Sequence, residues 1–154
     1  VLLQSTSKSI ANDALENALM ISANSVEDTL MEGLGLIRVP MLLEAQGKTT
    51  KAIAGYKALK NALIVHELYD DVCLKLGKLY VESAQWESAL AEFSLVQKAA
   101  GEGMWKEDAI FYIAKCRFEL EETEAQSALE DYLLNYPAGL YFDQARTMYR
   151  TLAL

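Results

Sequence analysis

Apolar residues recur every three or four positions along most of the chain, which is the spacing of amphipathic α-helices. The first such stretch begins near Ser9 and places four apolar residues on one side: Ile10, Ala14, Ala18 and Ile21. The last stretch begins near Leu140 and does the same with Phe142, Ala145, Tyr149 and Leu152. Between them the spacing repeats with short interruptions, so the sequence predicts a chain of successive helices.

Glycine and proline mark where these helices end. Pro40 falls inside a stretch that is otherwise helical, and a proline in a helix interior costs about 3 kcal/mol. We therefore expect either a kink near Leu36 or a break at Gly33–Gly35. Gly47 is expected to end that helix in the left-handed conformation. Pro137 ends a later helix that begins near Glu124.

The most specific pattern lies between Asp70 and Gly101. It consists of two parts separated by a turn, Cys73-x2-Leu76-Gly77-x2-Tyr80 and Ala89-x3-Phe93. Gly77 and Ala89 are small enough to let two helices approach closely, and the larger side chains fill the space between them. The pattern resembles the tetratricopeptide signature, W-x2-L-G-x2-Y followed by A-x3-F, with cysteine in place of tryptophan.

Neighbouring stretches resemble the same repeat less closely. The matching residues are Gly47, Ala52 and Tyr56 upstream, and Ala114, Ala125, Leu129 and Pro137 downstream. The corresponding alanines, Ala52, Ala89 and Ala125, lie 37 and 36 positions apart. The usual period of the family is about 34 residues, so the connections here are slightly long.

The resemblance implies an all-α fold, a right-handed superhelix of antiparallel helix-turn-helix hairpins with about seven helices. We predict one domain over residues 1–154. Its parts are an N-terminal flanking helix with the start of the next (8–32), a degenerate repeat (34–66), the best-matching repeat (70–101), a further repeat (106–137) and a C-terminal capping helix (140–154).

In this family the first helix of each hairpin lines a concave groove, and the resemblance implies that a peptide binds there. The groove candidates are Ile37, Met41, Leu74, Lys78, Val81, Phe111, Lys115 and Phe118. Inward residues of two successive repeats share one pattern with an offset of 37: acid, apolar, lysine, apolar, glutamate. These sets are Asp71, Leu74, Lys78, Val81, Glu82 and Asp108, Phe111, Lys115, Phe118, Glu119.

A simpler interpretation of the same residues stays open. Lys78–Glu82 and Lys115–Glu119 have the spacing of surface ion pairs, each worth a few tenths of a kcal/mol. Burial of the two phenylalanines against a neighbouring helix is an equal alternative to a binding role. The family's carboxylate clamp has asparagine where this chain has Lys78 and Lys115, so we expect no clamp. A ligand should be an extended or helical segment with apolar anchors.

Charge and composition exclude several classes of function. The formal net charge of −8 argues against binding to nucleic acid or to anionic lipid, and no apolar run is long enough to span a membrane. His66 is the sole histidine, and Cys73 and Cys116 fall in different predicted helices, where two buried free thiols are expected. We predict no catalytic, cofactor-binding or metal-binding residue.

The leading hypothesis is a non-catalytic protein–protein interaction module, an adaptor or scaffold that binds a peptide or protein partner. The alternative is a structural or oligomerisation module of a larger solenoid or cell-envelope complex, which leaves a homo-oligomer open. A third hypothesis is an activity that depends on Cys116. The sequence begins at Val1 without an initiator methionine. It fits a cytoplasmic protein or, if a signal or anchor was removed, a periplasmic one.

Overall fold

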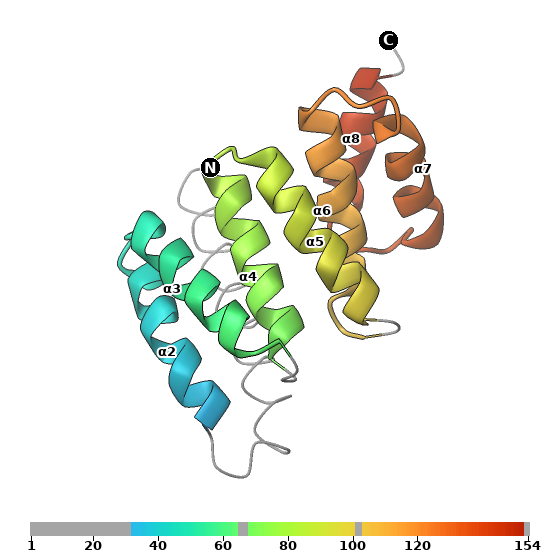
Figure 1. Ribbon diagram of the computed structural model, residues 1–154. Helices are drawn as coiled ribbons and strands as arrows, with labels where there is room; N and C mark the ends of the chain where they lie inside the picture. Colours follow the sequence, from blue (N-terminus) through green and yellow to red (C-terminus); the bar gives the residue numbers. More distant parts are fainter. Residues whose placement is uncertain (1–31, 65–67, 101–102, 153–154) are drawn as a thin grey trace. The chain divides into compact units, whose positions relative to one another are not determined.

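A computed structural model describes residues 32–64, 68–100 and 103–152 of the chain. These residues form seven α-helices and no strand, which confirms the all-α prediction (Figure 1). The helices are α2 (Glu32–Ala45), α3 (Thr49–Ala62), α4 (Tyr69–Glu82), α5 (Trp86–Ala100), α6 (Lys106–Glu119), α7 (Ala125–Asn135) and α8 (Phe142–Leu152). The helix expected from Ser9 onwards lies outside the described residues.

Three of these helices repeat one another with a strict period. The helices α2, α4 and α6 are each 14 residues long, and their first residues are 37 positions apart. Two positions after the end of each helix lies a left-handed residue: Gly47 at φ 68°, Ala84 at φ 52° and Glu121 at φ 54°. The expectation for Gly47 is therefore confirmed, and two residues other than glycine adopt the same conformation at the equivalent positions.

The turns that follow these three helices are bonded in the same way. After α2, the Gly47 amide donates to the Glu44 carbonyl at 2.8 Å and the Lys48 amide donates to the Leu43 carbonyl at 2.9 Å. The same pair of bonds closes the turns at Ala84 and Glu121. This is the Schellman arrangement, which satisfies carbonyls that the end of a helix would leave unpaired.

Replacing Ala84 with glycine is expected to stabilise the protein by about 0.5–1 kcal/mol, because glycine adopts a positive φ without the steric penalty of a Cβ atom. Thermal unfolding of the variant measures this gain. The matched control is Ala91→Gly on the exposed side of α5, which should destabilise by about 1 kcal/mol because its φ is helical. Destabilisation by both changes would contradict the argument.

The chain divides into two compact units, residues 1–68 and 69–154. The predicted helix pairs of residues 34–66, 70–101 and 106–137 correspond to α2–α3, α4–α5 and α6–α7. The assignment of all 154 residues to one domain stays a prediction. Each unit is described separately below.

In the described part of the first unit, α2 and α3 form an antiparallel hairpin (Figure 1). The helix α2 includes Gly33, Gly35 and Pro40, so the predicted break at Gly33–Gly35 is wrong, and the alternative of a kink near Leu36 stays a prediction. Gly55 on α3 lets the two helices approach closely beside the proline, since a Cβ atom there would lie 3.1 Å from the Cβ atom of Pro40. The Tyr56 hydroxyl also joins the two helices by donating to the Glu44 carboxylate at 2.6 Å.

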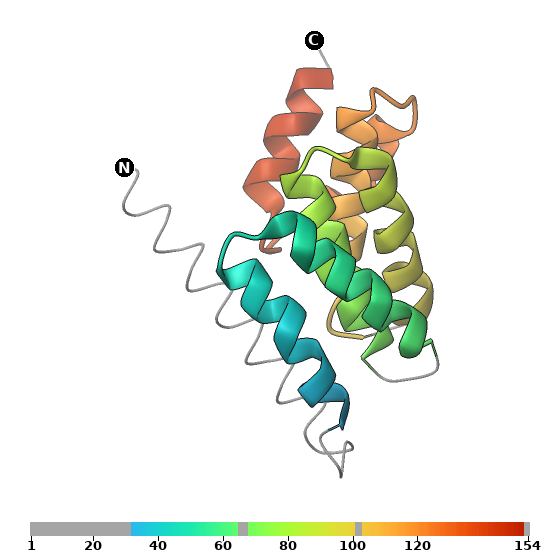
Figure 2. The same ribbon diagram turned by 60° about the vertical axis from the view of Figure 1, so that its left-hand side comes forward.

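In the second unit each helix packs against the next one along the chain, as both views show (Figures 1 and 2). The residues of the signature serve this packing, since all five are buried: Leu76, Gly77, Tyr80, Ala89 and Phe93. A Cβ atom on Gly77 would lie 2.7 Å from the ring of Phe93. The predicted close approach of α4 and α5 therefore depends on this glycine.

A hydrophobic core joins the last three helices, which also make contact between α6 and α8. Its fully or nearly buried members are Phe111, Ala114, Leu129, Tyr132, Ala145 and Met148. The helix α8 thus has an apolar inner side, while Asp143, Arg146 and Arg150 on its other side are exposed. This is the distribution that is expected of a capping helix.

Candidate protein-interaction surface

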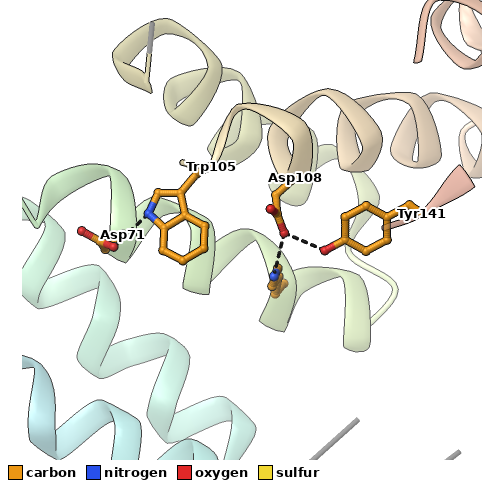
Figure 3. Close-up of polar contacts among 5 residues, drawn as sticks. Asp71, Trp105, Asp108 and Tyr141 are labelled. Atoms are coloured by element: carbon orange, nitrogen blue, oxygen red, sulfur yellow. Dashed lines mark hydrogen bonds and ion pairs between the residues drawn. The ribbon is translucent and has the colours of Figure 1, made fainter. Parts of the chain in front are cut away.

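Two aspartates join each first helix of the second unit to the start of the next one (Figure 3). The indole Nε1 of Trp105, just before α6, donates to the Asp71 carboxylate of α4 at 2.9 Å. The Tyr141 hydroxyl, just before α8, donates to the Asp108 carboxylate of α6 at 2.6 Å. Asp71 and Asp108 are 37 residues apart, so the same polar link recurs at successive repeats.

Asp108 also binds a lysine of the preceding repeat. The Nζ atom of Lys78 lies 3.1 Å from Oδ1 of Asp108, and the side chains are 20% and 15% exposed. A pair that is this well shielded is worth more than a fully exposed one, where the median is about 0–1 kcal/mol. The pair also connects α4 directly with α6.

Tyr112 on α6 lies between two lysines. The Nζ atom of Lys78 lies 5.4 Å from the centre of its ring, and that of Lys115 lies 6.0 Å away. The ring also stacks on Phe93 of α5, with 4.8 Å between the centroids. Both lysines are therefore positioned by an aromatic ring that is itself held in place by packing.

The eight predicted groove residues fall into two groups. Ile37, Leu74 and Phe111 are 1%, 1% and 0% exposed. Because a partner cannot reach them without opening the packing, they belong to the core rather than to a contact surface. The other five are partly exposed: Met41 in the first unit, and Lys78, Val81, Lys115 and Phe118 in the second.

The four partly exposed residues of the second unit, together with Tyr112, are called the α4–α6 face below. Val81 lies three residues after Lys78, and Phe118 lies three residues after Lys115, so each pair shares one side of its helix. The simpler interpretation as i,i+4 surface pairs does not hold for Lys115 and stays open for Lys78. Lys78 binds Asp108, and Lys115 forms no ion pair with Glu119 in the described structure.

A second polar cluster fixes the corner between α7 and α8, and no sequence pattern predicted it. The Glu107 carboxylate accepts hydrogen bonds from the Tyr132 hydroxyl at 2.8 Å and from the Leu140 amide at 2.7 Å. Burial and the bond to Glu107 both raise the pKa of Tyr132. A Cβ atom on Gly139 would lie 2.5 Å from this carboxylate, which leaves room there only for glycine. The cluster is structural.

The chemistry of a catalytic site is not supported by the part of the chain that the structure describes. Burial raises the pKa of the Cys116 thiol to about 12, so the reactive thiolate is scarce at neutral pH. Cys73 is a buried free thiol as well, as predicted.

The described residues of the chain contain no group of histidine, cysteine or acidic side chains suited to a metal ion. Nor does any of their helices have the length and apolar character needed to cross a membrane. His66 lies outside them.

Antiparallel helix pairs with equivalent turns, a small residue at the helix crossing and a 37-residue period define a protein of helical-hairpin repeats. A family model described as tetratricopeptide repeat matches residues 108–138, which cover most of α6 and all of α7. Residues 108–138 are therefore similar to a tetratricopeptide repeat, which supports the predicted resemblance to this family. Repeats of this family generally mediate protein–protein interactions and are typically non-catalytic. No curated protein matches the sequence.

Proposed function

We propose that the second unit is a non-catalytic interaction module that binds a segment of a partner protein across the α4–α6 face. One observation carries this proposal. Lysine and an apolar residue recur at the same register on α4 and α6, as Lys78 with Val81 and Lys115 with Phe118, and all four side chains remain partly exposed. Most neighbouring positions on α4 are buried, and on α6 Ala114 and Cys116 on either side of Lys115 are buried too.

The two residue types suit a peptide in different ways. Val81 and Phe118 offer apolar contact area that the fold has not covered, which is the kind of anchor that an extended or helical segment uses. Lys78 and Lys115 add directional polar contacts beside it. Since both helices present the same pair, a segment that crosses them meets two similar binding positions. A surface that binds a segment of a partner protein in this way is sufficient for an adaptor or scaffold role.

The test is the affinity of the protein for a co-purifying partner, or for a peptide selected from a random library, before and after Phe118→Ala and Val81→Ala. Each change should weaken binding about tenfold, since truncating an apolar anchor typically costs more than 1 kcal/mol. The matched control is Leu134→Ala on α7, because Leu134 is 72% exposed and lies outside the face. Unchanged affinity in both face variants would contradict the proposal.

The alternative, a structural or oligomerisation module, is favoured by one feature of the first unit. Leu36, Val39 and Leu42 of α2 are 53%, 61% and 58% exposed. The equivalent residues of α4, which lie 37 positions later, are all buried: Cys73, Leu76 and Leu79. An apolar face that is covered in one repeat and open in another is a typical contact surface.

Under this alternative, the partner is a second copy of the chain that pairs through α2. Light scattering at micromolar concentration should then find a dimer, and Val39→Glu should dissociate it without lowering helix content. A monomer at the same concentration would count against the alternative and would leave the peptide-binding proposal unaffected.

A further inference from the structure

Lys78 and Lys115 occupy equivalent positions of successive repeats but have different partners. Lys78 makes the ion pair with Asp108. Lys115 lies over the ring of Tyr112 at 6.0 Å and has no acidic partner within 4.0 Å in the described part of the chain. Glu119, one helical turn further along α6, is exposed and does not pair with it. The two equivalent lysines therefore differ in their surroundings: Lys78 has an acidic partner, and Lys115 has an aromatic ring beside it but no acidic partner among the described residues.

The repeat explains the difference. The acid that binds Lys78 belongs to the next first helix, at position 108. Because α8 begins 36 residues after α6, the equivalent position is Gln144 on α8, whose side chain is exposed and uncharged. The last junction thus provides a neutral amide where the preceding junction provides a carboxylate. Lys115 retains the lysine of the pattern while its acid is missing.

From this comparison we infer that an acidic side chain of the bound segment pairs with Lys115, taking the place that Asp108 takes at Lys78. The inference rests on the proposed function and specifies the ligand: a segment with aspartate or glutamate next to an apolar residue that contacts Phe118. Lys115 is partly buried, so pairing removes less water from it than from a free lysine. Tyr112 beneath it restrains the side chain before binding.

The net charge of the chain does not oppose this contact strongly. The formal charge of −8 repels an acidic peptide at long range, but charges further apart than about 8 Å are largely screened at physiological salt. Only nearby groups then decide the preference at this position. Glu119 is the acidic group that could favour a basic peptide instead, so the experiment includes it.

The experiment selects binding peptides from a random library displayed on phage. The peptides are displayed without a free C-terminus, so any acidic preference comes from side chains. Selections are made in parallel on the wild-type protein, Lys115→Gln and Glu119→Gln. The matched control is Lys98→Gln, which removes an exposed lysine near the end of α5. Thermal unfolding confirms that all four proteins are folded.

Peptides selected on the wild type and on Lys98→Gln should be enriched in aspartate or glutamate at one position beside an apolar residue. Selection on Lys115→Gln should lose this enrichment. In the best peptide, replacing the acid by its amide should weaken binding to the wild type about threefold to fivefold and leave binding to Lys115→Gln unchanged.

Three results would overturn the inference. One is selection of peptides without acidic enrichment on the wild type, and another is equal enrichment on Lys115→Gln. The third is enrichment in lysine or arginine that Glu119→Gln abolishes. All of these leave peptide binding itself intact. Failure to select any peptide would instead contradict the proposed function, and the inference with it.

Discussion

Replacing Phe111 with alanine is expected to lower the free energy of unfolding by about 3–5 kcal/mol, because the change leaves a cavity in the core between α6, α7 and α8. The Phe111 side chain is fully buried. Its ring stacks on Tyr141, with 4.2 Å between the centroids and 6° between the planes, and meets the edge of Tyr132 at 5.5 Å. Chemical denaturation of the wild type and the variant measures the loss.

Phe118→Ala is the matched control, since it removes the same side chain from the same helix at a partly exposed position. This variant should lose less than about half as much stability and should weaken partner binding. If Phe111→Ala instead left the stability unchanged and abolished binding, Phe111 would be a binding residue and not a core residue.

Replacing Gly77 with alanine is expected to destabilise the protein by about 1–3 kcal/mol, although alanine is the better helix former. The added Cβ atom would lie 2.7 Å from two atoms of the Phe93 ring, which is too close for any real contact. Phe93 is fully buried and stacked on Tyr112, so it has little room to move away. Thermal and chemical unfolding measure the effect.

Two companion variants separate this clash from a general effect of the substitution. Gly35→Ala places the same methyl group inside α2, where no atom lies within 4 Å of the new Cβ, and should gain about 0.5–1 kcal/mol. Phe93→Leu should cost less in the Gly77→Ala background than in the wild type, because the shorter side chain relieves the clash. Independent, additive effects would mean that the two residues do not interact.

Periodicity and the signature predicted most of the fold because both report on local geometry. The bounds of the second hairpin follow from the pattern of Leu76, Gly77, Tyr80, Ala89 and Phe93 within about two residues. Pro40 shows where this reasoning fails. Either a kink or a break was predicted from the sequence of this helix alone, whereas α2 includes Gly33, Gly35 and Pro40. Packing against α3 also matters, since a Cβ atom on Gly55 would lie 3.1 Å from the Cβ atom of Pro40.

The candidate surface was predicted less well than the fold, for a related reason. The heptad-like spacing places Leu74 and Val81 on the same side of α4, yet one is 1% exposed and the other is partly open. Exposure depends on what neighbouring helices cover. The Asp108 contacts with Lys78 and Tyr141 span 30 and 33 residues. A recurring aspartate followed by an aromatic residue before the next helix is the one signal that could have indicated them.

The bond between Trp105 and Asp71 makes an intrinsic optical probe of the boundary between consecutive repeats. Trp105 is only 7% exposed, and its indole is held by a carboxylate of the preceding first helix. Trp86 is the only other tryptophan of the chain. In a Trp86→Phe background, the emission of a single indole would therefore report when α4 and α6 separate. If the Trp105 fluorescence and the helical circular dichroism change at the same temperature, the repeats unfold in one step. If they change at different temperatures, the repeats separate one after another.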